Sequence, residues 1–242
     1  KGTDHIVAGS DMYPGAAALA SLSALITGSG FVYLHTFDLD HICVKNMQIS
    51  LPDVVVVNSN KKPIKELIDY SKGKYLIGPG ITYEFDKSKT CDFFDNGNVF
   101  DSGSFKAFKN IDAYNDDAIL TPHKGEFEKI FKLEKNCVLD IKLFKSIQKK
   151  IKSKIIILKA FNTFIITNKN IYIIDIGPSI LATAGSGDVL SGIIVSLLSQ
   201  GYSRLDASLL GVYLHAESAN YYMNNISNYG MTASKLINCI PF

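Results

Sequence analysis

The residues best suited to chemistry lie in one short turn, Gly185-Ser186-Gly187-Asp188, directly before an apolar run. Apolar residues recur at positions 189, 190, 193, 194, 197 and 198, which predicts a helix with one buried face that ends near Gly201. Unpaired backbone N–H groups and the positive end of the helix dipole meet at such a helix start and favour a phosphate or a developing anion. Gly185 and Gly187 have no Cβ, so a ligand can approach the backbone closely.

Asp188 stands in the first turn of this predicted helix. Its carboxylate either compensates the helix dipole or acts as a general base that takes a proton from a substrate hydroxyl beside an anion hole. Two other nucleotide-binding patterns are absent from the sequence. There is no Gly-x4-Gly-Lys-Ser/Thr loop, and Gly28-Ser29-Gly30 lacks the remaining glycine of a dinucleotide fingerprint.

The elements that must position this turn follow a strand–helix–strand pattern, with strands at His5–Gly9 and Phe31–Leu34 and a helix over Ala16–Ile26. The pattern continues with strands at Val54–Val57, Tyr75–Ile77, Ala118–Leu120 and Ile155–Lys159, helices at Lys124–Phe131 and Ile141–Ile151, and a hairpin of Thr163–Thr167 and Ile171–Ile174. Continuous apolar runs are typical of strands buried on both faces. We therefore expect one α/β domain with a mainly parallel central sheet covered by helices on both faces.

Composition excludes several classes of function. The 242 residues include 25 Lys+Arg and 23 Asp+Glu, so the net charge of +2 gives no reason to expect a nucleic-acid partner. The longest aliphatic runs cover about four residues, and a membrane span needs about twenty, so no membrane span is expected. Six lysines between positions 142 and 154 suggest a basic patch, but the apolar residues interleaved at helical spacing favour a solvated helix face.

The four cysteines, Cys43, Cys91, Cys137 and Cys239, are widely scattered. This spacing forms neither a zinc pattern nor a redox pair. We expect reduced, partly buried thiols in a cytoplasmic protein.

Several motifs together resemble the NAD(P)H-hydrate dehydratases, a branch of the ribokinase-like superfamily. The motifs are Gly9-Ser10-x2-Tyr13-x-Gly15-Ala16, Ile77-Gly78-Pro79-Gly80, Thr121-Pro122-His123-x-Gly125-Glu126, Lys159-x3-Thr163, Ala182-Thr183-Ala184-Gly185-Ser186-Gly187-Asp188, Gly211-Val212-Tyr213-Leu214-His215 and Gly230-Met231-Thr232-Ala233-Ser234. They span nearly the whole chain. The Gly-Ser-Gly-Asp turn is shared across the superfamily, and the Thr-Pro-His-x-Gly-Glu segment is more particular to this branch.

The resemblance implies a ribokinase-like fold and an enzyme that repairs hydrated NADH and NADPH (NADHX and NADPHX). Such enzymes use ADP, or in eukaryotes ATP, to phosphorylate the hydroxyl on the hydrated ring, and loss of phosphate restores the double bond. Asp188 would be the base, and the turn of Gly185, Ser186 and Gly187 would hold the transferred phosphoryl group. We expect ADP or ATP as co-substrate, and the Lys-, Ile- and Asn-rich composition favours ADP. We also expect Mg²⁺ held mostly by phosphates and water, with no metal ligands assigned.

By the same resemblance, Ala16, Gly80, His123 and Asp188 contact the hydrated cofactor. The residues alone leave other roles open: Ala16 as a helix-packing alanine, Gly80 as a turn glycine, and His123 as a capping or solvent-facing imidazole. The nucleotide would lie against Gly187 and the segment Lys159, Ala160, Phe161, Asn162 and Thr163. Lys159 could otherwise be a strand-end lysine facing water.

The chain departs from the family pattern at several places. Lys159-Ala160 replaces Lys-Gly, Ile176-Gly177-Pro178-Ser179 replaces Gly-Asn-x-Gly, Gly78-Pro79-Gly80-Ile81-Thr82 replaces Gly-Pro-Gly-Leu-Gly, Asp101-Ser102-Gly103 replaces Asp-Ala-Asp, and Lys235 replaces an Asp. None of these removes Asp188 or the glycine turn, so we expect an active enzyme.

Two other functions stay open at this point: a ribokinase-like kinase of a small alcohol such as a thiamin precursor, and a nucleotide-binding protein without catalysis. The resemblance further implies one dehydratase domain over residues 1–242, a homo-oligomer (dimer or tetramer), and absence from this chain of the epimerase domain that precedes it in many bacterial relatives.

Overall fold

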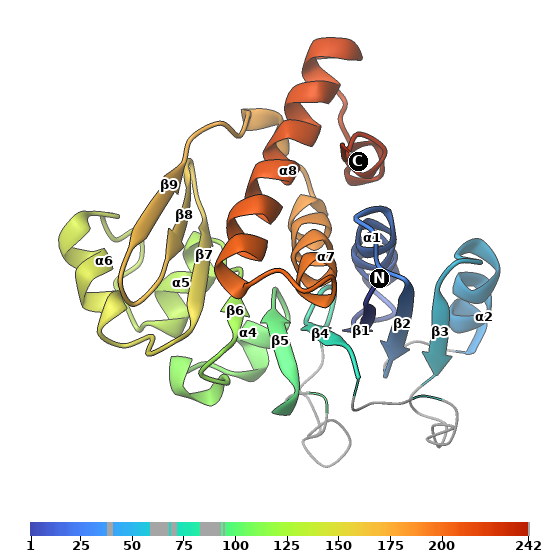
Figure 1. Ribbon diagram of the computed structural model, residues 1–242, viewed down its shortest axis with the longest axis horizontal. Helices are drawn as coiled ribbons and strands as arrows, with labels where there is room; N and C mark the ends of the chain where they lie inside the picture. The colour runs from blue at the N-terminus through green and yellow to red at the C-terminus, as the bar shows by residue number, and fades with distance from the viewer. Residues whose placement is uncertain (38–40, 59–67, 69–71, 83–92, 94, 242) are drawn as a thin grey trace.

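The protein is built on a nine-stranded sheet, whose strands can be followed from β9 at the left to β3 at the right in the computed structural model of Figure 1. The structure describes residues 1–37, 41–58, 68, 72–82, 93 and 95–241. The strands are β1 (Thr3–Val7), β2 (Phe31–Thr36), β3 (Val55–Asn58), β4 (Lys74–Ile77), β5 (Gly97–Phe100), β6 (Ile119–Leu120), β7 (Ile155–Lys159), β8 (Thr163–Ile166) and β9 (Ile171–Ile174). The helices are α1 (Pro14–Ile26), α2 (His41–Ser50), α4 (Ser104–Ala107), α5 (Lys124–Ile130), α6 (Ile141–Gln148), α7 (Ser186–Ser199), α8 (Arg204–Asn225) and α9 (Ala233–Ile237), with 3-10 turns η1 (Ile111–Ala113) and η2 (Ser179–Leu181).

The strand order is β3-β2-β1-β4-β5-β6-β7-β8-β9. Strands β1 to β7 are parallel to one another, and the hairpin of β8 and β9 adds two antiparallel strands beside β7. The chain adds strands on one side of β1 as far as β3 and then returns to place β4 on its other side. In open α/β sheets, ligands bind outside the carboxyl ends of the strands near such a reversal.

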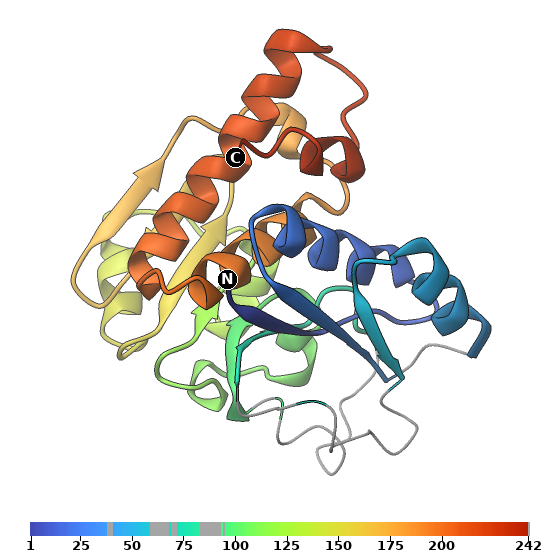
Figure 2. The same ribbon diagram turned by 45° about the vertical axis from the view of Figure 1, so that its right-hand side comes forward.

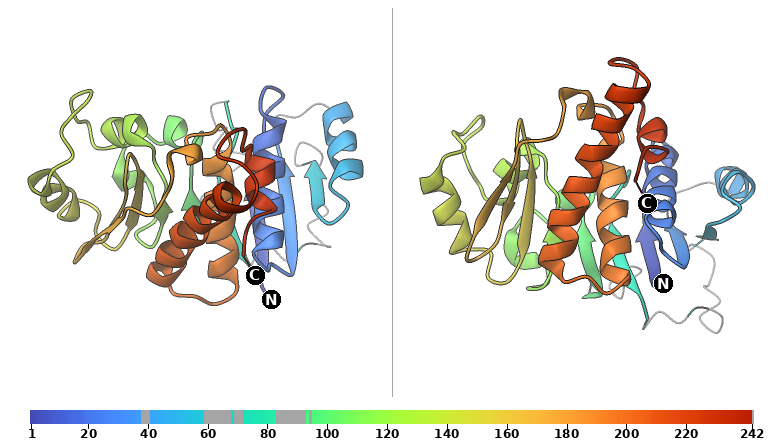
Figure 3. Two further views of the ribbon diagram at one scale, coloured as in Figure 1. Left: turned by 90° about the horizontal axis from the view of Figure 1, so that it is seen from above. Right: turned by 45° about the horizontal axis from the view of Figure 1, so that its top comes forward.

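Alternate residues of each central strand face two separate apolar cores. In β7, Ile155 and Ile157 join one core, and Ile156 and Leu158 join the other. The first core lies under α1, α2, α7, α8 and α9, and the second under α4, α5 and α6. Figure 3 (left) shows the sheet between the layers of α1, α7 and α8 and of α4, α5 and α6. Burial on both faces explains why these strands are continuous apolar runs.

The predicted α/β architecture is confirmed, and most predicted strands agree with the structure to within two residues. The glycine turn does open a helix, α7, and the predicted hairpin is β8–β9. The predicted Ile141–Ile151 helix ends earlier, at Gln148. Strand β5, helix α2 and the 22-residue helix α8, which crosses the sheet and extends past it (Figure 2), have no counterpart among the predicted elements.

The lysine-rich segment is a solvated face, as predicted, except at one position. Five of the six lysines are exposed, namely Lys142, Lys145, Lys149, Lys150 and Lys152, while the interleaved Phe144, Ile147 and Ile151 are buried. Lys154 is the exception, because its side chain is buried. Its ammonium lies 2.9 Å from Asp116 Oδ1. Cys137 and Cys239 are free thiols and Cys43 is partly buried, whereas the prediction for Cys91 falls outside the described residues.

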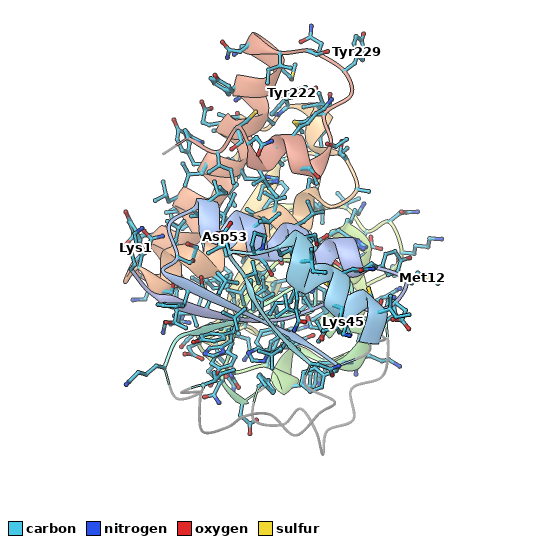
Figure 4. All side chains as sticks on the ribbon, turned by 90° about the vertical axis from the view of Figure 1, so that its right-hand side faces the viewer. Lys1, Met12, Lys45, Asp53, Tyr222 and Tyr229 are labelled. Carbon is cyan, nitrogen blue, oxygen red and sulfur yellow. The ribbon has the colours of Figure 1, made fainter. Side chains whose placement is uncertain are left out.

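Large apolar side chains are exposed at many places on the surface. Met12 in the loop after β1 is 73% exposed and Tyr229 beyond α8 is 84% exposed, and Figure 4 shows the two far apart on the molecule. Within the described part of the chain, no helix combines the length and apolar character needed to cross a bilayer.

Candidate active site

The loops that follow the parallel strands are joined to one another at the carboxyl edge of the sheet. After β1 and β4, Gly9 N–H donates to the Pro79 carbonyl oxygen over 2.8 Å. Ser10 Oγ donates to the Gly80 carbonyl oxygen over 2.8 Å. After β6 and β7, Lys159 N–H donates to the Pro122 carbonyl oxygen over 2.9 Å. These bonds fix the positions from which site residues project.

Helix α7 begins beside this edge with unpaired donors. Gly185 has φ +88°, a left-handed conformation that favours glycine, and it caps the helix without a side-chain hydrogen bond. Ser186 is held by Thr183, whose carbonyl oxygen accepts its N–H over 3.1 Å. Among the described residues, the N–H groups of Gly187 and Asp188 have no acceptor. The structure therefore has the free N–H groups and the dipole end that an anion site requires.

Lys159 and Asp101 bring charge to the same place. Lys159, the last residue of β7, places Nζ 2.9 Å from Oδ1 of Asp101, which follows β5 and is fully buried. A Cβ on Gly187 would lie 2.9 Å from Lys159 Nζ, so the ammonium sits over the first turn of α7. Burial alone would lower the pKa of Lys159, but neighbouring carboxylates, Asp101 first, hold it above the ordinary value.

The charges of Asp101 and Lys159 both act on the Asp188 carboxyl. Burial, and then the charge of Asp101, raise the pKa of Asp188 to about 7, while Lys159 opposes the rise. A carboxyl group with a pKa near the operating pH is suited to general-base catalysis. The arrangement can hold an anion and accept a proton next to it.

His123 and Glu126 form a capping box at the start of α5. His123 Nδ1 accepts from Gly125 N–H over 3.0 Å, and Glu126 Oε2 accepts from His123 N–H over 2.9 Å. The capping role that the sequence left open for His123 is therefore present. Its Nε2 lies 3.4 Å from Glu126 Oε1, and the side chain remains largely exposed. Burial, followed by the charge of Lys159, lowers the pKa of His123, and burial raises the pKa of Glu126 to about 7.

Ala16, in the first turn of α1, lies against Gly80 in the loop after β4. Gly80 has φ +67°, and a Cβ on it would lie 2.7 Å from the Tyr13 carbonyl oxygen and 2.8 Å from Ala16 Cβ. One turn further along α1, Leu19 lies 2.6 Å from where a Cβ on Gly185 would stand. The sheet edge thus brings these two predicted substrate residues close to the glycine turn.

The segment predicted to bind the nucleotide forms the turn between β7 and β8. Lys159 pairs with Thr163 across it, and the pairing leaves Ala160, Phe161 and Asn162 at the tip. Phe161 is fully exposed at this tip. Lys159 reaches the glycine turn, with Nζ 2.9 Å from where a Cβ on Gly187 would stand.

Three residues near the site escaped prediction as site residues: Asp101, Glu126 and His215. His215 on α8 holds the glycine turn, because its Nε2 lies 2.9 Å from the Ser186 carbonyl oxygen. Burial lowers the pKa of His215 to about 4, so the imidazole is neutral and donates through Nε2–H. The available signals were the Gly211–His215 motif for His215 and the Thr-Pro-His-x-Gly-Glu capping pattern for Glu126.

Comparison with known proteins first confirms the class of fold. A ribokinase-like superfamily protein from Enterococcus faecalis superposes with a TM-score of 0.84 at 21% identity, covering 99% of this chain and 85% of that one. The chain therefore has a ribokinase-like α/β fold.

The family follows from the sequence match. The NAD(P)H-hydrate dehydratase family model matches residues 5–242, and the chain belongs to this family. It is 30% identical to the bifunctional NAD(P)H-hydrate repair enzyme Nnr of Dictyoglomus turgidum, over 100% of this chain and 50% of the relative. It is 27% identical to the ADP-dependent (S)-NAD(P)H-hydrate dehydratase of Bacillus subtilis, over 99% of this chain and 88% of the relative.

The chain spans about half the length of the first two relatives, from Dictyoglomus turgidum and Helicobacter pylori. Among solved structures, the ADP/ATP-dependent NAD(P)H-hydrate dehydratase from Bacillus subtilis, co-crystallized with ATP/Mg²⁺, superposes with a TM-score of 0.82 at 26% identity. That match covers 99% of this chain and 87% of the Bacillus chain.

Proposed function

We propose that this chain catalyses the nucleotide-dependent dehydration of NADHX and NADPHX to NADH and NADPH. One observation carries the proposal: the Asp188 carboxyl stands beside unpaired N–H groups at the start of α7, with the Lys159 ammonium over the same turn. Membership of the NAD(P)H-hydrate dehydratase family supports the same reaction.

In the proposed reaction, Asp188 takes the proton of the hydroxyl on the hydrated nicotinamide ring. The hydroxyl oxygen bonds to the terminal phosphoryl group of the nucleotide, and the bond from that phosphorus to its bridging oxygen breaks, leaving AMP when ADP is used. The phosphate then leaves with its bonding electron pair while a ring proton is lost, which restores the double bond. Charge that spreads over the phosphoryl oxygens is stabilised by the N–H groups of Gly187 and Asp188 and by Lys159.

We assign the remaining contacts from the resemblance and the geometry together. Ala16, Gly80 and His123 border the hydrated ring, since Ala16 and Gly80 adjoin the glycine turn through α1. Gly187 and Lys159 hold the nucleotide phosphates, and Ala160, Phe161, Asn162 and Thr163 lie along the nucleotide. The fully exposed Phe161 ring leaves room for a base to stack on it.

We propose ADP as the co-substrate, as in the names of the Bacillus and Staphylococcus relatives, and Mg²⁺ as the metal. No group of three or more His, Cys, Asp or Glu among the described residues could hold a metal ion. The donor set therefore fits an ion held through nucleotide phosphates and water, the usual mode of Mg²⁺. When bound, the ion neutralises phosphate charge during transfer.

From the resemblance we also propose that the chain corresponds to the dehydratase part of the bifunctional relatives, one domain over residues 1–242. A dimer or tetramer in the cytoplasm fits the same resemblance. Light scattering of the purified chain tests the oligomeric state.

The proposal is tested by incubating the chain with hydrated NADH, Mg²⁺ and either ADP or ATP, and following the near-ultraviolet absorbance of the restored ring. We expect recovery with phosphate and AMP as products from ADP, or phosphate and ADP from ATP, rising with pH through about 7 as Asp188 ionises. Asp188→Asn should lower kcat by about 10²–10⁴-fold while AMP binding persists.

Other results would replace the proposal. A stable phosphorylated alcohol without ring recovery indicates a small-molecule kinase. AMP binding without turnover by the unaltered chain indicates a nucleotide-binding protein, and full turnover by Asp188→Asn refutes the role of Asp188.

A further inference from the structure

Asp101 and Lys159 form an ion pair between two strands that are not neighbours. Asp101 follows β5, Lys159 ends β7, and β6 lies between these strands in the sheet. The Asp101 carboxylate is fully buried, with Oδ1 2.9 Å from Lys159 Nζ. Removing one partner of such a pair leaves a buried charge uncompensated, which is strongly unfavourable. The pair therefore constrains where the ammonium can lie.

The pair directs the lysine toward the start of α7. Lys159 Nζ lies 2.9 Å from the point where a Cβ on Gly187 would stand, and Asp101 Oδ2 lies 3.9 Å from the same point. Glycine at position 187 thus leaves the space that the ammonium occupies. Asp101 Oδ2 is buried without a hydrogen-bond partner among the described residues, so this carboxylate faces the site with a free oxygen.

A lysine side chain is long and flexible, so an unheld ammonium would sample many positions. The Lys159 ammonium has three N–H donors, and one of them donates to Asp101 Oδ1. The other two are left for a phosphate, and no proton has to leave the lysine.

We propose that Asp101 is a positioning residue, which holds Lys159 Nζ against the first turn of α7 so that the ammonium meets the transferring phosphoryl group together with the Gly187 N–H. This inference rests on the proposed function, because it assigns the phosphoryl group of that reaction to Lys159. A carboxylate near a phosphate would by itself be unfavourable. The inference explains why Asp101 is nevertheless present: it positions the lysine that meets the phosphate.

The pKa of Asp188 depends on the charges around it. It therefore provides a measurement that would not change if Asp101 had a purely structural role. The groups that face this carboxyl are Asp101 after β5 and Lys159 at the end of β7, and Glu126 and His123 from α5 in turn face Lys159. The charge of Asp101 raises the pKa of Asp188, and the charge of Lys159 lowers it. Removing each charge should therefore shift the titration of Asp188 in opposite directions.

The test compares Asp101→Asn and Lys159→Met with a matched control, Asp116→Asn. Asp116 forms another lysine–aspartate pair of 2.9 Å, with Lys154, at the opposite edge of the sheet. We expect Asp101→Asn to lower kcat by about 10²-fold, the cost of misplacing a reacting group by about 1 Å, with the KM for hydrated NADH nearly unchanged. Asp116→Asn should leave kcat unchanged.

The pH dependence is measured on the same variants. The acidic limb of the activity profile should move to lower pH in Asp101→Asn and to higher pH in Lys159→Met. Titration of the Asp188 carboxyl by ¹³C NMR in the nucleotide-free protein should show the same two shifts. Gly187→Ala, which displaces the lysine tip while keeping both charges, serves if Asp101→Asn does not fold, and it should lower kcat similarly.

Unshifted Asp188 titration in both variants, or an Asp101→Asn enzyme with unaltered kcat, would overturn the inference. A wild-type chain that never restores NADH refutes the proposed function instead, and in that case the NMR shifts still report whether Asp101 and Lys159 are placed as described.

Discussion

Asp4 should make the stability of the protein fall as pH rises. Its carboxyl is fully buried at the amino end of β1, far from the catalytic edge, where it accepts a hydrogen bond from Ser29 Oγ. The Ser29 hydroxyl also contacts Ser196 Oγ of α7 over 2.7 Å. Asp4 Oδ1 has no partner among the described residues. Burial raises the pKa of Asp4 to about 7 from 3.8, and the hydrogen bonds of Ser29 and Ser199 oppose the rise only in part.

The sign follows from proton binding. Because the folded protein holds the Asp4 proton more tightly than the unfolded chain, the contribution is complete below pH 3.8 and is lost as pH rises through about 7. The difference between 3.8 and about 7 corresponds to about 4 kcal/mol in total, and about 3 kcal/mol of this falls between pH 5 and 8. His35 and His215 act in the opposite sense, because burial lowers their pKa values to about 3 and about 4.

The Asp4→Asn variant isolates the Asp4 contribution, since both histidines are present in both proteins. Urea denaturation at pH 5 and pH 8 gives the free energy of unfolding of each. The wild-type advantage over Asp4→Asn should shrink by about 3 kcal/mol between the two pH values. Asp117→Asn, which alters an exposed carboxyl, is the control and should show a constant difference. A constant difference for Asp4→Asn as well would refute the reasoning.

Two further predictions concern packing and buried charge. Gly192→Ala should lower the free energy of unfolding by about 1–3 kcal/mol, because its Cβ would overlap Ser23 and the Ala20 backbone where α7 crosses α1. The control Gly15→Ala meets nothing within 4 Å and should be neutral or stabilising. Asp116→Asn should lower Tm more than Lys154→Met, because it leaves the buried Lys154 ammonium without its carboxylate. Thermal denaturation of the four variants measures both effects, and equal Tm values within either pair would contradict the stated cause.

The sequence was most informative where burial on both faces imposed continuous apolar runs, as in Ile155–Lys159, and least informative where small residues make the contacts. Helix α8 buries Ala207, Ser208, Gly211 and Ala219 in addition to Val212, Leu214 and Tyr222, so small residues interrupt the apolar pattern of its buried face. Strand β5 contains only Val99 and Phe100 as apolar residues after Gly97 and Asn98, and β6 has two residues in all. Such short strands are specified by their neighbours in the sheet.

The candidate site divides in the same way. Asp188 and the glycine turn are local in sequence, so their juxtaposition with a helix start could be predicted. Asp101 and Lys159 are 58 residues apart, and only the placement of β5 and β7 on either side of β6 brings them together. Strand order depends on the whole chain, so Asp101 could be noticed only as a departure from a motif.

The charge balance of the site bears on how a nearly neutral protein would bind the phosphate of the proposed reaction. Asp101, Glu126 and Asp188 surround one lysine, so the side chains alone do not favour phosphate. Burial raises the pKa values of Glu126 and Asp188 to about 7, so both carry only part of their charge near neutral pH. The charge of Asp101 is compensated by Lys159 at 2.9 Å. What remains for the phosphate of the proposed reaction is the helix end with its free N–H groups and the two Lys159 N–H donors that Asp101 does not use. The attraction for phosphate is therefore local to one turn of α7 and requires no basic surface.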